Sequence, residues 1–167
     1  MRTHLICSVC IAITLGSAPS FAKAIQDLFH TLDIDSSFAA QKLHNNLTYK
    51  SIIHDQATLR AFLIIRQPGI KLNSDEPFIL PVEPDLTITL HLNTPSSPQP
   101  DYVVWTGSIS EKPDTLPDAP NSVRLVEHDD RLEGTLRYNG QLYKIRPINE
   151  KVYAVVKLKE CTRKDAQ

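Results

Sequence analysis

Beyond Thr58 the chain alternates between apolar and polar residues in short runs, which is the pattern of β-strands that bury one face. The run over residues 86–92 is the clearest, because its leucines and isoleucine fall on one side of an extended chain and its threonines and histidine on the other. The same pattern predicts strands over residues 59–66, 78–82, 86–92, 102–109, 122–127, 131–138, 141–148 and 152–158.

Turn residues separate these strands. Asn139 and Gly140 lie between two alternating runs and supply the two positive-φ positions of a type I′ turn, which predicts a tight hairpin with a fixed register. Pro68 and Gly69 predict a second turn.

Two stretches rich in proline connect other strands, over residues 93–100 and 111–120. Proline has no N–H to donate to a β-ladder, and serine competes for backbone hydrogen bonds. We therefore expect both stretches to be loops without strand pairing.

The segment before Thr58 has a helical pattern instead. Its apolar residues recur at helical spacing, at Ile25, Leu28, Phe29 and Leu32. Asp35 or Ser36 is placed to cap a second short helix that ends near Leu43.

These elements predict a mainly β fold. About eight short strands at this spacing favour an antiparallel sandwich or a bent barrel, with a short helical N-terminal preface. The expected division is a preface over residues 23–57, one β domain over 58–158 and a polar tail over 159–167.

The first 22 residues have the composition of a secretory signal peptide. Arg2 precedes an apolar run from Leu5 to Leu15, and small residues follow up to a small-x-small site that ends at Ala22. The apolar run is short for a bilayer span. We therefore expect an exported protein, periplasmic or secreted, with no membrane span once residues 1–22 are removed.

Charge and cysteine content restrict the expected partners. The formal net charge is −1 for the whole chain and becomes −2 when Arg2 is removed with the signal peptide. The linear sequence has no basic run that favours nucleic acid or a membrane surface. Of three cysteines only Cys161 follows residue 22, so no internal disulfide is expected in the exported chain.

No catalytic motif is present in the sequence. Five glycines in the whole chain exclude a glycine-rich phosphate loop, and no histidine pair has the spacing of a zinc helix. A small enzyme with a site built from scattered residues such as His54, Asp55 and Arg60 is the least favoured alternative. We expect no enzyme activity, no metal and no cofactor.

Four aromatic residues are candidates for a protein-binding surface, although core packing is the ordinary role of such residues in strands. They lie in the predicted strands of the C-terminal half, at Trp105, Tyr138, Tyr143 and Tyr153.

The order of motifs in that half carries a family likeness. An aromatic-and-glycine strand is followed by a Ser-Val-x-Leu strand, a strand centred on x-Leu-x-Gly and a Tyr-x-Ile strand, at Trp105 with Gly107, residues 122–125, 132–134 and 143–145. This resembles the prodomain of secreted zinc metalloproteases of the reprolysin and peptidyl-Asp endopeptidase type, over roughly residues 58–158.

The resemblance implies a function in binding rather than in hydrolysis. The chain has no zinc-binding helix, so the peptidase activity of that family is not expected. What the likeness implies is that the chain binds a protease, assists its folding and blocks its cleft.

In many such proteases a prodomain cysteine ligates the catalytic zinc, and the likeness implies that Cys161 is a possible zinc-directed thiol. The proline and glycine residues that usually frame such a cysteine are absent here. A free thiol or a bridge to another chain are the alternatives.

The sequence thus predicts an exported, non-catalytic binding protein, a prodomain-like inhibitor or folding helper of a secreted zinc metalloprotease. The alternative is a secreted or periplasmic β-module that acts as an adaptor or subunit in an envelope or secretion assembly.

Overall fold

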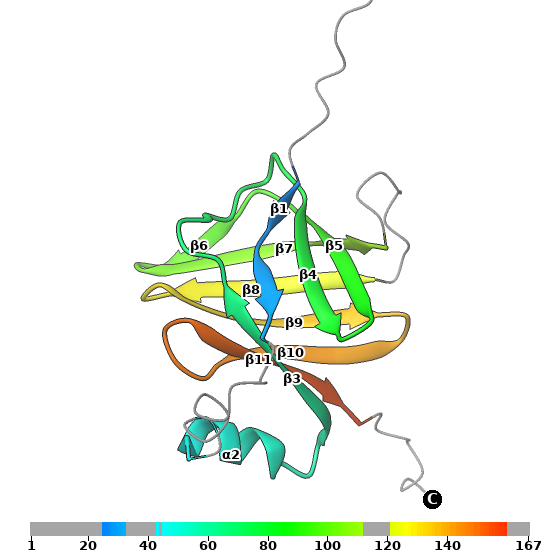
Figure 1. The fold of residues 1–167 in the computed structure, drawn as a ribbon. Helices are drawn as coiled ribbons and strands as arrows, with labels where there is room; N and C mark the ends of the chain where they lie inside the picture. Colours follow the sequence, from blue (N-terminus) through cyan, green and yellow to red (C-terminus); the bar gives the residue numbers. More distant parts are fainter. Residues whose placement is uncertain (1–24, 33–42, 44, 112–120, 160–167) are drawn as a thin grey trace, which may run out of the picture.

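A computed structural model of the chain describes residues 25–32, 43, 45–111 and 121–159. Within these residues one continuous sheet curls into a nearly closed barrel, with one short helix on its outside. Figure 1 shows β4 and β5 crossing in front of strands β7, β8 and β9 as the sheet turns back on itself. The mainly β fold predicted from the sequence is confirmed.

The described strands follow in chain order, with helix α2 (Leu47–Ile53) before β3. They are β1 (Gln26–Asp27), β2 (Phe29–Thr31), β3 (Thr58–Arg66), β4 (Phe78–Glu83), β5 (Leu86–Leu92), β6 (Ser96–Gln99), β7 (Tyr102–Ser110), β8 (Ser122–His128), β9 (Arg131–Tyr138), β10 (Gln141–Pro147) and β11 (Val152–Leu158). In the sheet their order is β1-β4-β5-β7-β8-β9-β10-β11-β3-β2, and β6 pairs with β7.

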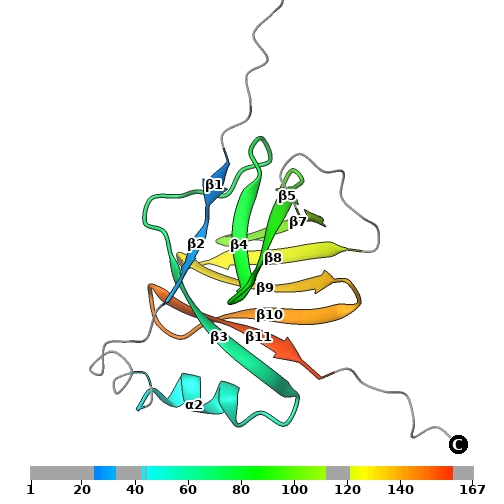
Figure 2. The same ribbon diagram turned by 45° about the vertical axis from the view of Figure 1, so that its right-hand side comes forward.

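The N-terminal segment closes the barrel. β1 pairs in parallel with β4, and β2 pairs antiparallel with β3. Leu28 lies between β1 and β2: its N–H donates to the carbonyl of Ile79 and its carbonyl accepts from the N–H of Gln67. One short segment therefore bonds to both free edges of the sheet, as Figure 2 shows.

The predicted helix over residues 25–32 is therefore wrong. Its apolar spacing fitted a helix, but a helix would have left the facing edges of β3 and β4 without partners for their backbone groups. Long-range pairing with those edges outweighed the local pattern. Leu28 and Phe29 are both buried, which an extended bridge between two edges allows.

A second correction concerns the loop predicted over residues 93–100. Residues Ser96–Gln99 form β6, which pairs with β7 through an irregular register. All four residues of β6 are exposed, and Pro98 falls where the register shifts. Proline is tolerated in such an edge strand because its missing donor faces no partner.

The predicted hairpin turn is confirmed. Asn139 and Gly140 have φ values of 48° and 81°, and Tyr138 pairs with Gln141. The β8–β9 turn is built the same way, with positive φ at Asp129 and Asp130. Asparagine and aspartate tolerate this region better than most residues.

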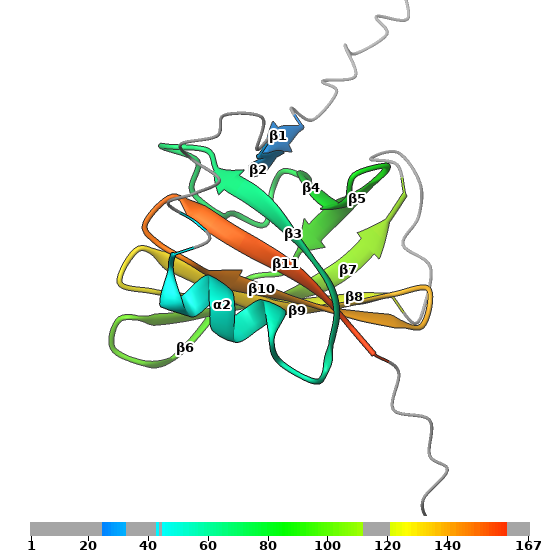
Figure 3. The same ribbon diagram turned by 60° about the horizontal axis from the view of Figure 1, so that its bottom comes forward.

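The core has two parts. The larger part fills the barrel interior, where inward residues from every long strand meet, among them Phe78, Leu125 and Tyr153. The smaller part lies on the outer face of β3 and β11, where Ile52 of α2 packs against the sheet. Figure 3 shows α2 on the outside of the barrel.

Several sequence predictions fall outside the described residues. They are the signal peptide over residues 1–22, most of the helix predicted to end at Leu43, residues 112–120 of the predicted loop over 111–120, and the tail with Cys161. In the part of the chain that the structure describes, no helix has the length and apolar character needed to cross a membrane.

Candidate functional site

The two ends of the barrel interior hold the polar side chains of interest. Strands β3 and β11 are antiparallel, with Ile65 opposite Val152 and Arg60 opposite Lys157. Arg66 therefore lies at one end of the barrel and Lys157 at the other. We call these the groove end and the closed end.

An ion pair spans the groove end. Arg66 of β3 follows inward-facing Ile64 by two residues, and Glu127 of β8 follows inward-facing Leu125 by two. Alternation turns both side chains toward the barrel mouth. Their Nη2 and Oε1 atoms lie 2.7 Å apart, and Arg66 Nη1 donates to the carbonyl of Asp130 at 2.9 Å.

This environment keeps the Arg66 guanidinium charged. Burial lowers its pKa, but the hydrogen bond and charge of Glu127, with a contribution from Tyr153, outweigh burial and raise the pKa above its usual value. The pair is thus a fixed, charged feature at the rim of the mouth.

Trp105 of β7 lies at the same end. Only 6% of its side chain is exposed. Its indole Nε1 is buried and forms no hydrogen bond within the described residues. Buried donors without a partner are rare in folded proteins and cost about 1–3 kcal/mol.

A groove of about 810 Å³ runs along this end between the β3–β4 loop and strands β7 and β8. Its apolar lining is Ile65, Ile70, Leu72, Val103 and Trp105. Its charged lining is Arg66, Lys71, Lys151, Glu127, Asp130 and Glu150. The groove therefore combines an apolar wall with three cations and three anions, which leaves it without a strong net charge.

The predicted turn at Pro68 and Gly69 forms part of the groove wall. Gly69 has a φ of +80°, a region that most side chains disfavour. Gln67, just before it, is tied by its N–H to the carbonyl of Leu28 in the closing segment. The groove wall is thus fixed at its base by the strand that closes the barrel.

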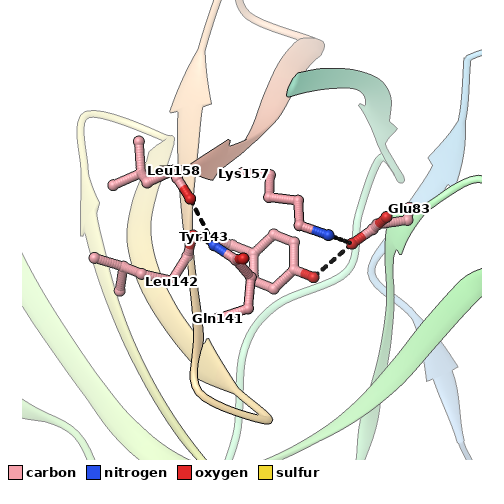
Figure 4. A network of polar contacts seen from close by, with 6 residues as sticks. All are labelled: Glu83, Gln141, Leu142, Tyr143, Lys157 and Leu158. Carbon is pink, nitrogen blue, oxygen red and sulfur yellow. Dashed lines mark hydrogen bonds and ion pairs between the residues drawn. The ribbon is translucent and has the colours of Figure 1, made fainter. Parts of the chain in front are cut away.

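The closed end holds a different arrangement, shown in Figure 4. Glu83 accepts a hydrogen bond from the Tyr143 hydroxyl at 2.6 Å and pairs with Lys157 Nζ at 2.8 Å. Tyr143 and Lys157 are direct cross-strand partners on β10 and β11. Lys157 Nζ lies 5.9 Å from the centre of the Tyr143 ring, within range of a cation–π contact.

A β-bulge aims Glu83 at this cluster. The register of β4 and β5 shifts between Pro81 and Glu83, so that Glu83 pairs with Leu86 directly after inward-facing Val82. Bulges commonly redirect a side chain in this way. The hydrogen bonds from Lys157 and Tyr143 lower the pKa of Glu83, and burial with the Glu83 hydrogen bond raises the pKa of Tyr143.

The four predicted protein-binding aromatics separate in the structure. Trp105 lines the groove, whereas the three tyrosines are 4% exposed or less. Tyr138 donates to Glu111, Tyr143 donates to Glu83, and Tyr153 accepts from the N–H of Leu132. Side chains this buried cannot form a docking surface in this fold. The structure therefore corrects the prediction for the three tyrosines, which are core residues.

The residues of the scattered-enzyme alternative do not converge. His54 is the C-cap of α2, and Asp55 accepts a hydrogen bond from the N–H of Ala57. Arg60 is exposed on β3. Among the described residues no group of three or more histidine, cysteine, aspartate or glutamate side chains is placed to hold a metal ion.

A serine and a histidine that sequence reasoning missed do meet. His91 Nε2 and Ser110 Oγ are 2.9 Å apart on neighbouring strands. This is the spacing of a nucleophile and its base. Ser110 is only 2% exposed, however, so its hydroxyl is out of reach of a substrate in this conformation.

Arg66 and Glu127 are the groove residues that sequence reasoning missed. Each lies at the end of an alternating run, on the side that carries the apolar residues, and a charged residue on an apolar face is a usable signal. Their pairing across 61 positions of sequence was not readable from the pattern.

Comparison with protein-family models, with curated proteins and with solved structures finds no match to this chain. The likeness to metalloprotease prodomains is neither supported nor opposed by these comparisons and stays a prediction from the sequence.

Proposed function

We propose that this chain is a non-catalytic binding protein that holds a small amphipathic ligand in the groove at one mouth of the barrel. The observation that carries the proposal is the indole N–H of Trp105, which is buried without a hydrogen-bond partner in the described residues, on a side chain that lines the groove. A ligand acceptor would reach this N–H through a shift of the groove lining.

An unpaired donor beside a groove favours a ligand that accepts a hydrogen bond. The donor costs free energy in the empty protein, and an acceptor placed against it would recover that cost. Barrel mouths are common ligand sites, and pockets of about 300–1,000 Å³ are usual for small molecules. The groove volume of about 810 Å³ falls in this range.

The lining suggests the ligand's chemistry. An apolar body would pack on Ile70, Leu72 and Val103, and a carbonyl or carboxylate oxygen would accept from Trp105. Arg66 already pairs with Glu127, so Lys71 and Lys151 are the cations left at the rim for an anionic head.

A binding role without catalysis agrees with the geometry described above, since the serine that meets a histidine is buried. Export stays a proposal that rests on residues 1–22. A metalloprotease partner and an envelope-assembly partner both stay predictions, and the burial of the three tyrosines removes the surface first assigned to them.

Trp105 is the only tryptophan in the chain, so its fluorescence reports on the groove directly. Decanoate is titrated into the purified protein below its micelle concentration, and decyltrimethylammonium, which has the same chain but no acceptor, is the matched probe. We expect decanoate to shift the emission and decyltrimethylammonium to do so much more weakly.

The Trp105→Phe variant is then titrated by calorimetry. Loss of one hydrogen bond is expected to weaken decanoate binding by about threefold to tenfold. Tyr102→Phe, which changes an exposed ring outside the groove, serves as control and keeps wild-type affinity. No binding of either probe, or equal binding of both that Trp105→Phe leaves unchanged, would overturn the proposal.

A further inference from the structure

The outer face of strands β8, β9 and β10 carries a concentration of positive charge. Alternation turns Leu125, Leu136 and Ile145 into the barrel, so their neighbours in sequence point outward. The outward cations, which we call the basic face, are Arg124, Arg131, Arg137, Lys144 and Arg146. All five are exposed, and none forms an ion pair with another described residue.

The sheet register arranges these cations in rows. Arg124 lies opposite Thr135, and Thr135 lies opposite Lys144, so two cations flank a threonine across three strands. Arg137 lies opposite Ser122, and Arg131 lies opposite His128. Neighbouring rows on one face of a strand are about 7 Å apart, so the face presents charge at regular intervals.

Charge is segregated over the molecule. The described residues include 12 Lys and Arg and 13 Asp and Glu. The basic face has five of the cations and one of the acids, Glu133, which leaves seven cations and 12 acids elsewhere. A nearly neutral protein thus has one strongly positive side, and such a side attracts polyanions.

The basic face has two shallow depressions. A depression of about 490 Å³ is bordered by Arg124, Lys144 and Arg146, with Thr135 between them. A second depression, of about 340 Å³, lies between Thr48 of α2 and Arg131. Arg146 and Glu133 border both depressions, which therefore lie side by side next to the helix.

We infer that the basic face binds a linear acidic polysaccharide. A flexible chain with repeated carboxylate or sulfate groups can place successive groups against the cations that border the two neighbouring depressions.

The same face is poorly suited to single-stranded nucleic acid. Such binding uses an aromatic platform for each of several bases. Here Tyr102, at the β7 corner of the face, is the one large aromatic that is exposed among the described residues, and it already stacks on His128 with ring centres 4.0 Å apart.

The test titrates the full chain by calorimetry with dextran sulfate and with polygalacturonate, using neutral dextran as the uncharged probe. We expect both acidic polymers to bind, neutral dextran not to bind, and affinity to fall steeply with added salt because counterions are released. A thymidine oligonucleotide and vesicles of phosphatidylcholine with phosphatidylglycerol are the competing arms, and both are expected to bind more weakly than dextran sulfate.

The variant Arg124→Gln/Lys144→Gln/Arg146→Gln removes three charges from exposed positions, so its melting temperature should stay near that of the wild type. We expect it to lose at least about tenfold in affinity for dextran sulfate. The matched control Lys50→Gln/Arg60→Gln/Lys159→Gln makes the same change in net charge at exposed residues that border neither depression, and it is expected to lose about twofold or less.

Three results would each overturn the inference. One is no binding of either acidic polymer at low salt. Another is equal loss of affinity in the two triple variants, which would assign binding to net charge alone. The last is tighter binding of the oligonucleotide or the vesicles than of the polysaccharides, which would assign the basic face to another class of partner.

Discussion

Each end of the barrel interior contains an acid–base pair and a buried tyrosine. At the groove end these are Arg66, Glu127 and Tyr153; at the closed end they are Lys157, Glu83 and Tyr143. The closed end joins its three groups through two hydrogen bonds of 2.6 and 2.8 Å onto one carboxylate. At the groove end, Trp105 Nε1 has no hydrogen-bond partner among the described residues, and a groove opens beside the ion pair.

The difference shows how similar side chains serve two purposes. A polar cluster in which each group has its partner stabilises the fold. Removing one member leaves the others without hydrogen-bond partners and lowers the free energy of unfolding. A buried donor without a partner costs free energy in the empty protein, and a ligand that supplies an acceptor would recover that cost. The structural end and the candidate site both carry charges. They differ in whether each buried polar group has a hydrogen-bond partner.

The largest expected effect comes from removing one acid at each end. Glu83→Ala leaves Lys157 and the Tyr143 hydroxyl without their shared acceptor, and we expect it to lower the free energy of unfolding by about 2–3 kcal/mol. Glu127→Ala should cost about 1 kcal/mol, because Arg66 keeps its bond to the carbonyl of Asp130. Urea unfolding measures both. Equal losses of stability in the two variants would mean that Glu83 and Glu127 stabilise the fold to the same degree.

A smaller effect is expected when the polar atom of one buried aromatic is removed at each end. Tyr143→Phe deletes a paired hydroxyl and should cost about 1–2 kcal/mol. Trp105→Phe deletes an unpaired N–H, so the relief of that donor offsets lost packing, and stability should change by less than about 1 kcal/mol. Thermal unfolding of the two variants measures both losses of stability. A larger loss in Trp105→Phe would indicate that its N–H has a partner after all.

The smallest effect concerns acid pH. Because Lys157 and Tyr143 lower the pKa of Glu83 in the folded protein, the unfolded chain binds a proton there more readily. The stability from this site is present above the ordinary glutamate pKa of 4.5 and is lost as pH falls through the lower native pKa. Urea midpoints measured between neutral and acid pH should fall less steeply in Glu83→Gln than in the wild type. Parallel curves would contradict the assignment.

The sequence predicted all eight long strands to within two residues at their ends, because alternation and turn residues are local signals. It did not predict β1 and β2, whose six-residue span is held by edges that lie more than 30 residues away in sequence. It also missed Glu83, because a bulge breaks the alternation that would have shown which way its side chain points.

Trp105 was identified from the sequence as a candidate, but for a protein surface rather than a groove. Within one strand the cations of the basic face lie an even number of residues apart, as Lys144 and Arg146 do, so the sequence shows that they share a side. This spacing does not show which strands lie next to each other. Only the register brought Lys144 opposite Thr135 and, beyond it, Arg124.

The sequence by itself determined that the chain forms strands, where most of them turn and which side of each is apolar, because these properties depend on residues a few positions apart. The tertiary structure alone decided that the sheet closes through its N-terminal segment, that Arg66 meets Glu127 across the mouth, and that the Trp105 N–H has no partner among the residues that the structure describes. Those outcomes depend on contacts between distant strands, for which no local pattern carries the information.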